Sequence, residues 1–359
     1  CDWSSDVCSS DLNQSRFQTM FRTTAILALC AAAVSANVHD RSFYEEKFFN
    51  WLKTHQVKPV NGMHFVQMLK NFADNEDFIH AHNAKGKSYQ LGHNKFSHLS
   101  QSEYAAYVKL APMAVQKSTA AFVHEAVGDV PAAWDWTTKG AVTGVKDQGQ
   151  CGSCWSFSTT GAMEGAYFNK NGNLVSFSEQ EFVDCDNRNG SPKGSDMGCN
   201  GGLMDNAFTW ATKNGGICSE ADYPYTSGVS KKAGTCNTSC TAVPNSAPKS
   251  HTDVAKSSDS AMMSALYKNP VSIAIQADQK EFQLYKSGVF TGSCGTQLDH
   301  GVLAVGYGSL NGEDFYKVKN SWGTVWGDAG YILLGRGDKY NNGAGQCGML
   351  TGPPSYPNF

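Results

Sequence analysis

The uneven distribution of cysteine constrains most strongly what this 359-residue chain can fold into. Nine of its twelve Cys lie after Val130, three lie within the first 30 residues, and none lies between residues 37 and 126. So many cysteines favour an oxidising compartment, in which disulfides persist. Because nine is odd, the last region must keep either an intermolecular bridge or one free thiol. The sequence therefore predicts a disulfide-bonded C-terminal part that follows a segment without disulfides.

Composition and charge exclude several classes of function. A hydrophobic content of 41% is enough to bury a sizeable core. The chain carries 29 Lys and Arg against 32 Asp and Glu, a net charge of -3, so we expect no nucleic-acid partner. No apolar run reaches 18 residues, so we also expect no membrane anchor.

The first 36 residues are interpreted as two segments that precede the fold. Residues 1–19 are rich in Ser and Asp without periodicity, and we interpret them as a non-native leader. Residues 20–36 combine the charge of Arg22, an apolar run from Ala25 to Val34 and a small-residue end at Ala36. This order is typical of a signal peptide and predicts entry into the secretory pathway.

Residues 37–126 contain eight of the ten His. Apolar residues recur at helical spacing in 43–55 and in 63–83, which predicts two amphipathic helices. The Ala-rich stretch 109–131 predicts an extended connector that is easily cut.

The region after Val130 predicts an α+β fold, with a helical half followed by a sheet half. Helices are expected from Cys154 to the Asn171-Gly172 turn and over 203–214. Short β-branched or aromatic runs punctuated by Gly predict strands within 270–277, 300–308, 315–323 and 330–335.

The motif QGQCGSCWSF allows three interpretations. Zinc binding is disfavoured because no second Cys or Cys/His pair stands at ligand spacing. Thiol–disulfide exchange is disfavoured because no strand precedes the motif. The third interpretation is that one Cys is bridged and Cys154, the first residue of the expected helix, is activated. A helix dipole and a nearby imidazolium can lower a thiol pKa to roughly 3.5–7.5.

Only two His follow Val130, so such a thiol has little choice of partner. His251 stands in the polar stretch KSHTDVAKSSDS and is expected at the surface. His300 heads an apolar strand, which favours it as the partner, with a hydrogen-bonded core His as the alternative.

Four motifs together carry a resemblance to a known family: GQCGSCWSF, GCNGGLMD, LDHGVLAVGYG and KNSWGTVWGDAGY. From about Val130 to the C-terminus the chain resembles the papain family of cysteine proteases, and GCNGGLMD resembles its cathepsin L branch. The resemblance implies a two-lobed fold with a helical left lobe, a β-barrel-like right lobe and a substrate cleft between them. It also implies a cysteine endopeptidase that works through a thioester.

The resemblance assigns roles residue by residue. It makes Cys154 the nucleophile, His300 the base and acid, Asn320 the residue that orients the imidazole, and Gln148 a side-chain donor of the oxyanion hole. Expected substrate-binding residues are Gly202, Leu203, Met204, Ala274, Asp299, Gly301, Trp322 and Gly352. Because the pocket positions are small or apolar, we expect a bulky hydrophobic residue, rather than Arg, one position before the residue at the cleaved bond.

The resemblance also implies the disulfides Cys151–Cys199, Cys185–Cys236 and Cys294–Cys347. Cys218 and Cys240 remain, and we predict that they form an extra bridge, which leaves Cys154 free. Asn189 and Asn237 begin glycosylation sequons on long loops, although Pro192 weakens the first.

Residues 37–126 resemble the family's inhibitory propeptide, with 127–359 as the mature protease domain. Phe72, Asn75, Ile79 and Asn83 match its helical motif, whereas His64 and Met68 replace Glu and Arg. Gly92, Asn94 and Phe96 match the next motif, and His98 replaces its Asp. We hypothesise that the pro-segment leaves when its imidazoles charge below about pH 6.5; the alternative is that these His are merely solvated.

The combined expectation is a secreted or lysosomal/vacuolar cysteine endopeptidase, made as an inactive precursor. It needs no cofactor or metal and acts as a monomer on protein and peptide substrates, with its own propeptide as intramolecular inhibitor. One alternative is a catalytically inactive homologue that serves as a binding or storage protein, and another is a thiol–disulfide oxidoreductase. The presence of Cys154, His300, Asn320 and Gln148 together favours the enzyme.

Overall fold

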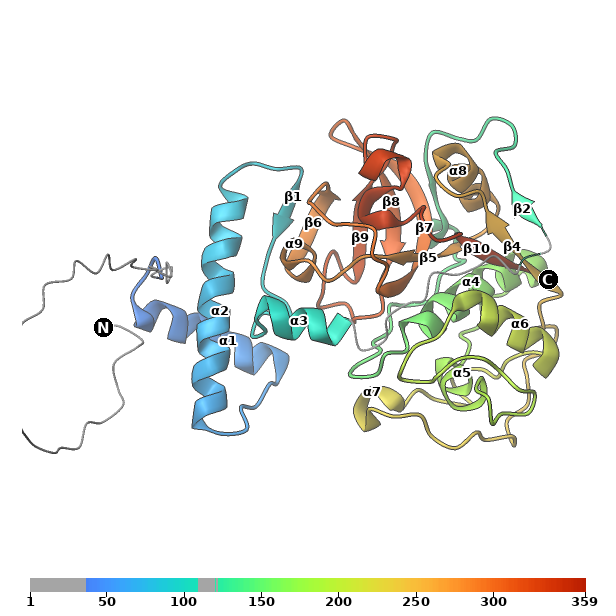
Figure 1. Cartoon of the computed structure of the whole chain (residues 1–359), viewed down its shortest axis with the longest axis horizontal. Helices are drawn as coiled ribbons and strands as arrows, with labels where there is room; N and C mark the ends of the chain where they lie inside the picture. Colours follow the sequence, from blue (N-terminus) through green and yellow to red (C-terminus); the bar gives the residue numbers. More distant parts are fainter. Residues whose placement is uncertain (1–36, 109–119, 121) are drawn as a thin grey trace, which may run out of the picture. The chain divides into compact units, whose positions relative to one another are not determined.

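The computed structural model describes residues 37–108, 120 and 122–359 (Figure 1). The expected leader and signal peptide lie outside the described residues, as does connector segment 109–119. None of the helices in the described ranges is long and apolar enough to cross a bilayer.

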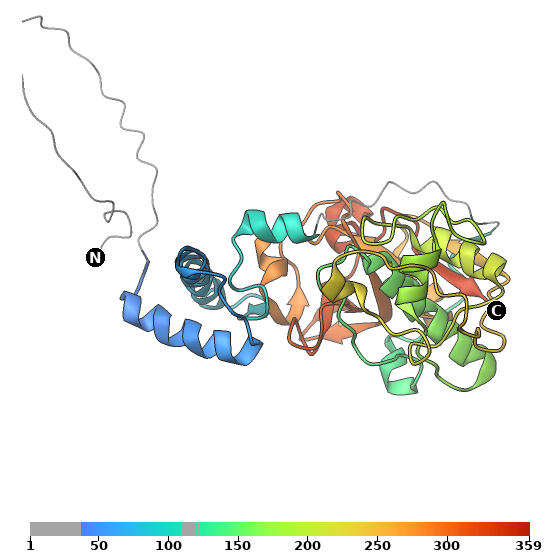
Figure 2. The same cartoon turned by 90° about the horizontal axis from the view of Figure 1, so that it is seen from below.

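Two crossed helices begin the described chain. α1 spans Arg41–His55 and α2 spans Gly62–Asn83, and Figure 2 shows α1 lying across α2. Their facing side chains bury a small apolar core of Tyr44, Phe48, Trp51, Met68, Leu69, Phe72 and Ala73. Both helices confirm the expected amphipathic segments. They are followed by the strand β1 (Tyr89–Leu91) and the helix α3 (Gln101–Val108).

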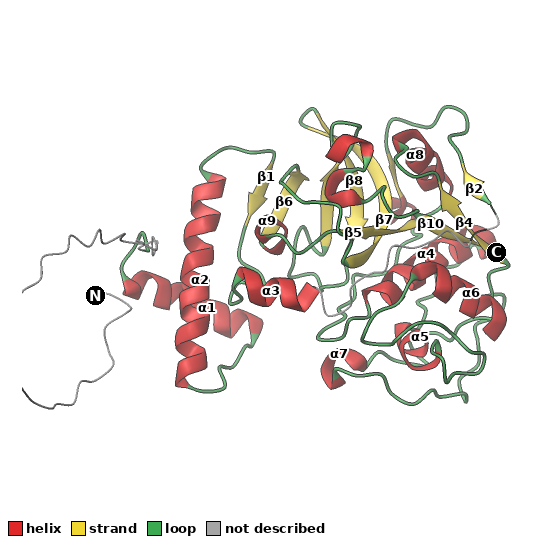
Figure 3. Ribbon diagram, in the orientation of Figure 1, coloured by secondary structure: helices red, strands yellow, loops and turns green. Residues whose placement is uncertain are grey.

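The helical lobe is built around α4 (Cys154–Asn171), whose residues 154–167 are all buried. It ends at Gly172, which has a left-handed φ of 80° and confirms the expected boundary. The other helices of this lobe are η1 (Trp136–Lys139), α5 (Glu179–Cys185), α6 (Met204–Asn214) and α7 (Ser227–Ser230). Figure 3 shows α4 to α7 grouped together, apart from most of the strands.

Glycines let α4 approach the sheet closely. A Cβ atom on Gly161 would lie 2.6 Å from Leu303 Cδ2, and one on Gly165 would lie 2.4 Å from Pro270 Cγ. Any larger residue at these two positions would push the helix away from the sheet, because Leu303 lies on one strand and Pro270 directly precedes another. Because Cys154 begins this helix, its position relative to the sheet depends on this contact.

One ten-stranded sheet has the order β1-β6-β9-β8-β7-β5-β10-β4-β2, and β3 pairs with β7. Its strands after residue 130 are β3 (Trp134–Asp135), β4 (Ser250–Val254), β5 (Val271–Ile275), β6 (Tyr285–Phe290), β7 (His300–Leu310), β8 (Glu313–Lys319), β9 (Tyr331–Gly335) and β10 (Ser355–Asn358). The remaining helices are α8 (Asp259–Lys268), α9 (Lys280–Gln283), η2 (Asn341–Gly343) and η3 (Gln346–Gly348). The four expected strands correspond to β5, β7, β8 and β9, and the α+β class is confirmed.

The two end strands of the sheet come from the segment 37–126. β1 pairs antiparallel with β6, and β2 (Val123–His124) pairs parallel with β4. The core of the sheet also takes in apolar side chains of this segment, namely Ile79, Tyr89, Leu91, Phe96, Tyr104 and Val108. The segment is therefore a structural part of the sheet, and short strands so far apart in sequence give no pattern that would predict this.

Four disulfides join the cysteines after Val130. Three lie in the helical lobe, Cys151–Cys199, Cys185–Cys236 and Cys218–Cys240, and the fourth is Cys294–Cys347. These are the four pairs expected from the sequence, including the additional Cys218–Cys240 bridge. Cys154 is free.

The expectation that His251 lies at the surface is wrong. His251 is on β4 and is 6% exposed, and its Nε2 lies 3.8 Å from Asp205 Oδ2. The polar composition of its stretch suggested a loop, but pairing of β4 with β10 and β2 and packing against α6 bury His251, Thr252 and Asp253.

Candidate active site

Cys154 lies where α4 meets β7. Ser153 precedes it at the N-cap position, and the thiol faces the positive end of the helix dipole. Its side chain is buried, and Sγ accepts a hydrogen bond from Gly301 N at 3.4 Å. Because Gly301 follows His300 in β7, this contact brings the two expected catalytic elements together.

His300 is fixed by Asn320, which directly follows β8. His300 Nε2 lies 2.8 Å from Asn320 Oδ1, and the same oxygen accepts a hydrogen bond from Ser321 N at 2.8 Å. Because Oδ1 can only accept, Nε2 carries a proton in this contact. Nδ1 is then the nitrogen that can accept a proton in the neutral imidazole.

Trp322 covers this pair. Its ring is 1% exposed and stacks on the imidazole of His300 at a centroid distance of 4.6 Å and an interplanar angle of 21°. The indole therefore keeps one face of the imidazole away from water.

Burial holds both reactive groups in their neutral forms. It raises the pKa of the Cys154 thiol to about 11, against the lowering effect of the hydrogen bond from Gly301. It lowers the pKa of His300 to about 4, against the opposite effect of Asn320. The expected lowered thiol pKa is therefore wrong for this covered form, because desolvation outweighs the helix dipole.

Gln148 is held by both ends of its amide. Nε2 donates to Cys151 O at 3.0 Å, and Oε1 accepts from Ser321 Oγ at 2.7 Å. The side chain is 5% exposed. These bonds fix an amide donor in the loop that precedes Cys154.

The other expected substrate-binding residues come from three regions. Gly202 and Leu203 precede α6, Met204 begins it, and Ala274 and Gly301 are paired across β5 and β7. A Cβ atom on Gly301 would lie 3.3 Å from Met204 Sδ, so these two positions are adjacent. Gly352 instead lies beside Leu298, because a Cβ there would be 3.0 Å from Leu298 Cδ1. Asp299 Oδ1 accepts from Ala277 N at 2.7 Å, which indicates a role in holding the backbone.

Aromatic residues of the pro-segment pack against Trp322. Phe96, Tyr104 and Tyr107 meet its ring edge-to-face, with centroid distances of 5.1, 6.1 and 6.2 Å. Tyr107 also donates through its hydroxyl to Gly149 O at 2.7 Å, next to Gln148. The pro-segment thus contacts the indole that covers His300 and the loop that leads to Cys154.

Polar contacts also hold the pro-segment in this position. Lys95 Nζ forms an ion pair with Asp147 at 2.7 Å, and Tyr104 OH donates to Ala277 O at 2.8 Å. A cavity of about 460 Å³ remains between the two parts. It is lined by Gly149, Gln150 and seven residues of the pro-segment, namely Lys95, Phe96, His98, Leu99, Glu103, Ala106 and Tyr107.

The pro-segment has ion pairs of its own at Glu76. Glu76 on α2 lies 2.7 Å from His93 Nε2 and also pairs with Lys47 on α1. The bond to His93 contributes most to lowering the pKa of Glu76, to about 2. The segment therefore has charged contacts even though His64 and Met68 replace the Glu and Arg of the motif.

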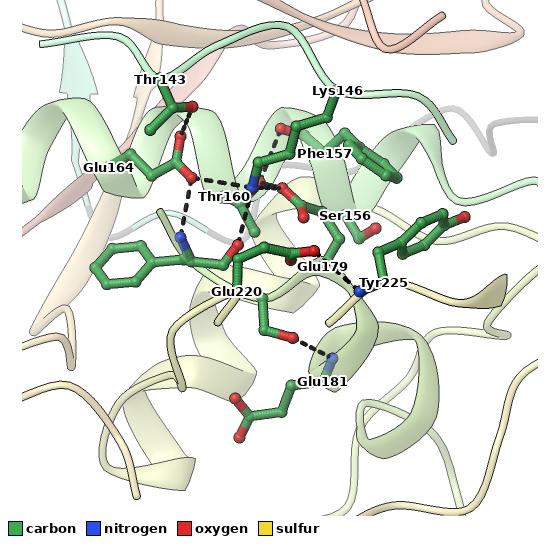
Figure 4. Close-up of polar contacts among 12 residues, drawn as sticks. Thr143, Lys146, Ser156, Phe157, Thr160, Glu164, Glu179, Glu181, Glu220 and Tyr225 are labelled. Carbon is green, nitrogen blue, oxygen red and sulfur yellow. Dashed lines mark hydrogen bonds and ion pairs between the residues drawn. The ribbon is translucent and has the colours of Figure 1, made fainter. Parts of the chain in front are cut away.

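A buried charge cluster of Lys146, Glu164 and Glu179 lies in the helical lobe (Figure 4). Lys146 Nζ contacts Glu179 Oε1 at 2.6 Å and Glu164 Oε1 at 3.3 Å. Burial raises the pKa of Glu179 to about 7, against the attraction of Lys146. Burial acts in the same direction on Glu164, but the charges of Lys146 and Lys319 outweigh it and lower the pKa.

Lys319, the residue before Asn320, belongs to this cluster. Its Nζ donates to Thr143 Oγ1 at 3.0 Å, and Thr143 donates to Glu164 Oε2 at 2.6 Å. A cavity of about 20 Å³ is lined by members of the cluster and by Asn320. Sequence reasoning missed this cluster, because its members lie far apart and each is a common surface residue type.

Two groups of described residues bring three potential metal ligands together. Glu181 lies near Cys218 and Cys240, but their disulfide removes the thiolates. Asp205, His251 and Asp253 are all buried, with ligand atoms within 4.8 Å of one another. Ser355 Oγ donates to Asp205 Oδ1 at 2.5 Å, so one carboxylate already serves a structural contact.

Comparison with known proteins agrees with this geometry. Residues 130–356 match the papain family cysteine protease model, and residues 48–104 match the cathepsin propeptide inhibitor domain. Cysteine proteinase RD21A of Arabidopsis thaliana is 46% identical over 359 residues, covering 93% of this chain and 75% of that protein. Vignain of Ricinus communis is 41% identical over 351 residues, covering 92% and 93%. The chain spans between 65% and 93% of the length of three such plant relatives.

The fold is also found among solved precursors. The proform of the ragweed pollen allergen Amb a 11, a cysteine protease, superimposes with a TM-score of 0.77 at 35% identity. That match covers 89% of this chain and 96% of the allergen. The chain therefore belongs to the papain family of cysteine proteases and carries the propeptide inhibitor domain of its precursors.

Proposed function

We propose that Cys154, His300, Asn320 and Gln148 hydrolyse peptide bonds in this cysteine endopeptidase. One observation carries the proposal. The free thiol of Cys154 accepts a hydrogen bond from Gly301 N, and Gly301 directly follows His300, whose imidazole is fixed by Asn320. A thiol, a base and an orienting third group form the arrangement that nucleophilic catalysis requires.

Each step follows from these groups. Nδ1 of His300 takes the thiol proton, and the thiolate attacks the carbonyl carbon to form a C–S bond and an oxyanion. Donors from Gln148 and the Cys154 backbone stabilise that oxyanion. The C–N bond then breaks as the imidazolium protonates the leaving amine, which yields a thioester. His300 next activates water, and its attack releases the acid and restores the thiol.

Removal of the pro-segment switches this chemistry on. In the covered form, Cys154 is held as a thiol and His300 as a neutral imidazole by burial. Water that enters after release reduces the cost of charge on both groups, so a thiolate–imidazolium pair can form.

Alkylation tests the proposal directly. Treating the acid-activated protein with an epoxide should add one label at Cys154 and abolish peptide cleavage. A thiol–disulfide oxidoreductase would instead reduce insulin disulfides before labelling. Full peptide cleavage by protein labelled at Cys154 would contradict the proposal.

The expected pocket composition predicts substrate preference. With Gly at position 352 and Met204 beside Gly301, an Arg side chain one position before the residue at the cleaved bond would lose water without gaining a charged partner. We predict kcat/KM values roughly 10- to 100-fold higher for fluorogenic peptides with Leu or Phe there than with Arg. Gly352→Glu should narrow this difference. Equal cleavage of Leu and Arg peptides by the unchanged enzyme would contradict the pocket assignment.

His98 provides a test of acid release. Its Nδ1 is buried without a hydrogen-bond partner among the described residues, and its ring lies 5.1 Å from that of Trp51. Burial lowers the pKa of His98 to about 4, although the backbone of Lys95 and the charge of Glu103 act in the opposite direction. The docked form therefore binds fewer protons than the released form between about pH 6.5 and 4. Docking is favoured above this window and weakens as the pH falls through it.

The non-titrating variant His98→Asn should therefore lose the pro-segment more slowly in acid. We expect a rate of activation about tenfold lower at pH 4.5, measured by gel and by peptide cleavage, and little change near pH 7. His80→Asn, an exposed position on α2, is the matched control and should follow the original profile. An unchanged profile for His98→Asn would remove His98 from the release mechanism.

The remaining assignments concern partners and location. Four disulfides fit passage through the secretory pathway. Within it, we propose a secreted or lysosomal/vacuolar enzyme that acts as a monomer on protein and peptide substrates. The mature domain is proposed to begin near residue 127.

A further inference from the structure

The hydroxyl of Tyr225 joins both ends of the loop that leads to Cys154. It lies 2.8 Å from Gln148 O and 2.7 Å from Ser153 Oγ. Because a carbonyl oxygen can only accept, the tyrosine donates to Gln148, and the hydroxyl of Ser153 therefore donates to the tyrosine. One O–H group thus connects residue 148 to residue 153 across the loop.

Ser153 uses its side chain for this contact and not for capping α4. It occupies the N-cap position, at which a Ser side chain commonly accepts a bond from the first turn of the helix. Its side chain makes no such bond with the described residues. The hydroxyl is buried and bonds to Tyr225 instead. The residue directly before Cys154 is therefore tied to Tyr225.

Tyr225 is fixed by contacts of its backbone and of its ring. Its N–H donates to Glu220 Oε1 at 2.9 Å, a bond drawn in Figure 4. Its ring meets that of Phe157 edge-to-face at a centroid distance of 4.8 Å. Phe157 lies in the first turn of α4, the helix that Cys154 begins. The hydroxyl is therefore presented to the loop from a fixed position.

The segment that follows Tyr225 supports the same loop through its backbone. Gly228 O, in α7, accepts from Gln150 N at 2.9 Å. A Cβ atom on Gly149 would lie 2.6 Å from Gly228 O. The backbone of the loop thus rests directly on α7, and the Tyr225 hydroxyl adds a contact to each of its ends.

The pro-segment holds the neighbouring carbonyl of this loop. Tyr107 OH donates to Gly149 O at 2.7 Å, whereas Tyr225 OH donates to Gln148 O. Removal of the pro-segment takes away the first bond and leaves the second. Of these two tyrosines, only Tyr225 remains to hold the loop in the mature enzyme.

The bridge restrains the two donors expected for the oxyanion. One donor is the side-chain amide of Gln148, and the other is the N–H of Cys154, which follows Ser153. Both stabilise an oxyanion fully only when each lies about 2.7–3.1 Å from it. A displacement of about 1 Å at such a site can cost up to about 100-fold in rate. The separation of the two donors therefore matters as much as their presence.

We propose that Tyr225 is a positioning residue of the oxyanion hole, whose hydroxyl holds Gln148 and Ser153 at the separation that both donors need. The inference rests on the proposed function, in which Gln148 and the backbone of Cys154 stabilise the oxyanion. Tyr225 acts through the loop and not on the reacting atoms, because its hydroxyl is engaged by Gln148 O and Ser153 Oγ.

Tyr225→Phe tests the proposal, because it removes the hydroxyl and keeps the ring. For a Leu-containing fluorogenic peptide, we expect kcat to fall roughly tenfold and KM to stay within about threefold, since the oxyanion forms only after attack. Alkylation of Cys154 by iodoacetamide should keep its rate within about twofold, because displacement of iodide from a saturated carbon forms no oxyanion. A general disturbance of the site would slow both reactions.

Tyr223→Phe is the matched control. The hydroxyl of Tyr223 also contacts two partners, Asp184 Oδ2 at 2.9 Å and Asn237 N at 3.0 Å, and neither belongs to the loop before Cys154. Its loss removes as many polar contacts from a residue two positions away, so it reports the cost of a missing tyrosine hydroxyl in this region. The control should keep kcat within about twofold.

A double-mutant cycle with Gln148→Ala shows whether Tyr225 acts through the oxyanion donors. If it does, removing the hydroxyl of Tyr225 in the Gln148→Ala background should lower kcat by less than about threefold, because the donor that it positions is already absent. Two independent effects would multiply, and the further loss would again be roughly tenfold.

The outcomes separate this inference from the proposed function. The positioning role is overturned by a kcat of Tyr225→Phe within about twofold of the unchanged enzyme, by an equal loss of alkylation rate, or by independent effects in the cycle. If Tyr225→Phe does not fold, Ser153→Ala decides, since it removes the donor to the same hydroxyl and should lower kcat roughly threefold to tenfold. Absence of both peptide cleavage and alkylation in the unchanged enzyme would instead contradict the proposed function.

Discussion

Replacing Cys154 by Ser is expected to lower kcat/KM for peptide cleavage by at least about 10⁴-fold. A hydroxyl is far less acidic than a thiol, so the His300 imidazole cannot generate an equivalent nucleophile at this site. The precursor should also accumulate with its pro-segment attached if release requires its own activity. Rates with a fluorogenic peptide and the mass of the acid-treated precursor measure both effects.

The substitution should leave the fold intact. Cys154 takes no part in the four disulfides, and oxygen replaces sulfur with little change in shape. A melting temperature close to that of the unchanged precursor would confirm this. Residual cleavage above about one hundredth of the original rate, in a preparation free of other proteases, would rule out Cys154 as the nucleophile.

Replacing Gln148 by Ala is expected to lower kcat by roughly 10²- to 10³-fold with a smaller change in KM. The lost amide would act mainly on the oxyanion, which exists only after attack on the carbonyl carbon. Its bonds to Cys151 O and Ser321 Oγ already fix its orientation, so little reorganisation is needed during the reaction.

Gln150→Ala is the matched control for this prediction. Gln150 is exposed on the same loop, and it holds Gly228 O through its backbone N–H, which the substitution retains. The control should keep kcat within about twofold, consistent with an exposed side chain. Equal losses in both variants would mean that loop stability, rather than oxyanion binding, explains the effect.

Local patterns predicted the elements that carry the site. The helix from Cys154 to Asn171 and the strand headed by His300 were readable because apolar periodicity, Gly and turn signals agree there. Three disulfide pairs were implied by the family resemblance, and Cys218–Cys240 was predicted from the two cysteines that remained. For the helix, the strand and the first three pairs, the relevant information lies within a short stretch or a recognisable motif.

What depends on contacts between distant segments could not be predicted. His251 stands in a polar stretch, and only the pairing of β4 shows that it is buried. The same holds for the pKa of Cys154, whose direction depends on whether the thiol is covered. Asp186 and Asp196 are unremarkable in a polar loop, and only the fold shows that both are buried.

The end strands of the sheet, β1 and β2, cover edges that would be exposed once the pro-segment is removed. Gly92 N and Ser88 O bond to the backbone around β6. Phe122 O accepts from Asp253 N within β4, and His124 O accepts from Ala255 N directly after it. Cleavage near residue 127 would remove β1 and β2 from the two edges of the sheet. The main-chain groups of β6 and β4 that bonded to them would then face water. Bare margins of this kind are open to pairing with other chains. Until its cover is removed, the zymogen is therefore protected against self-association as well as against premature proteolysis.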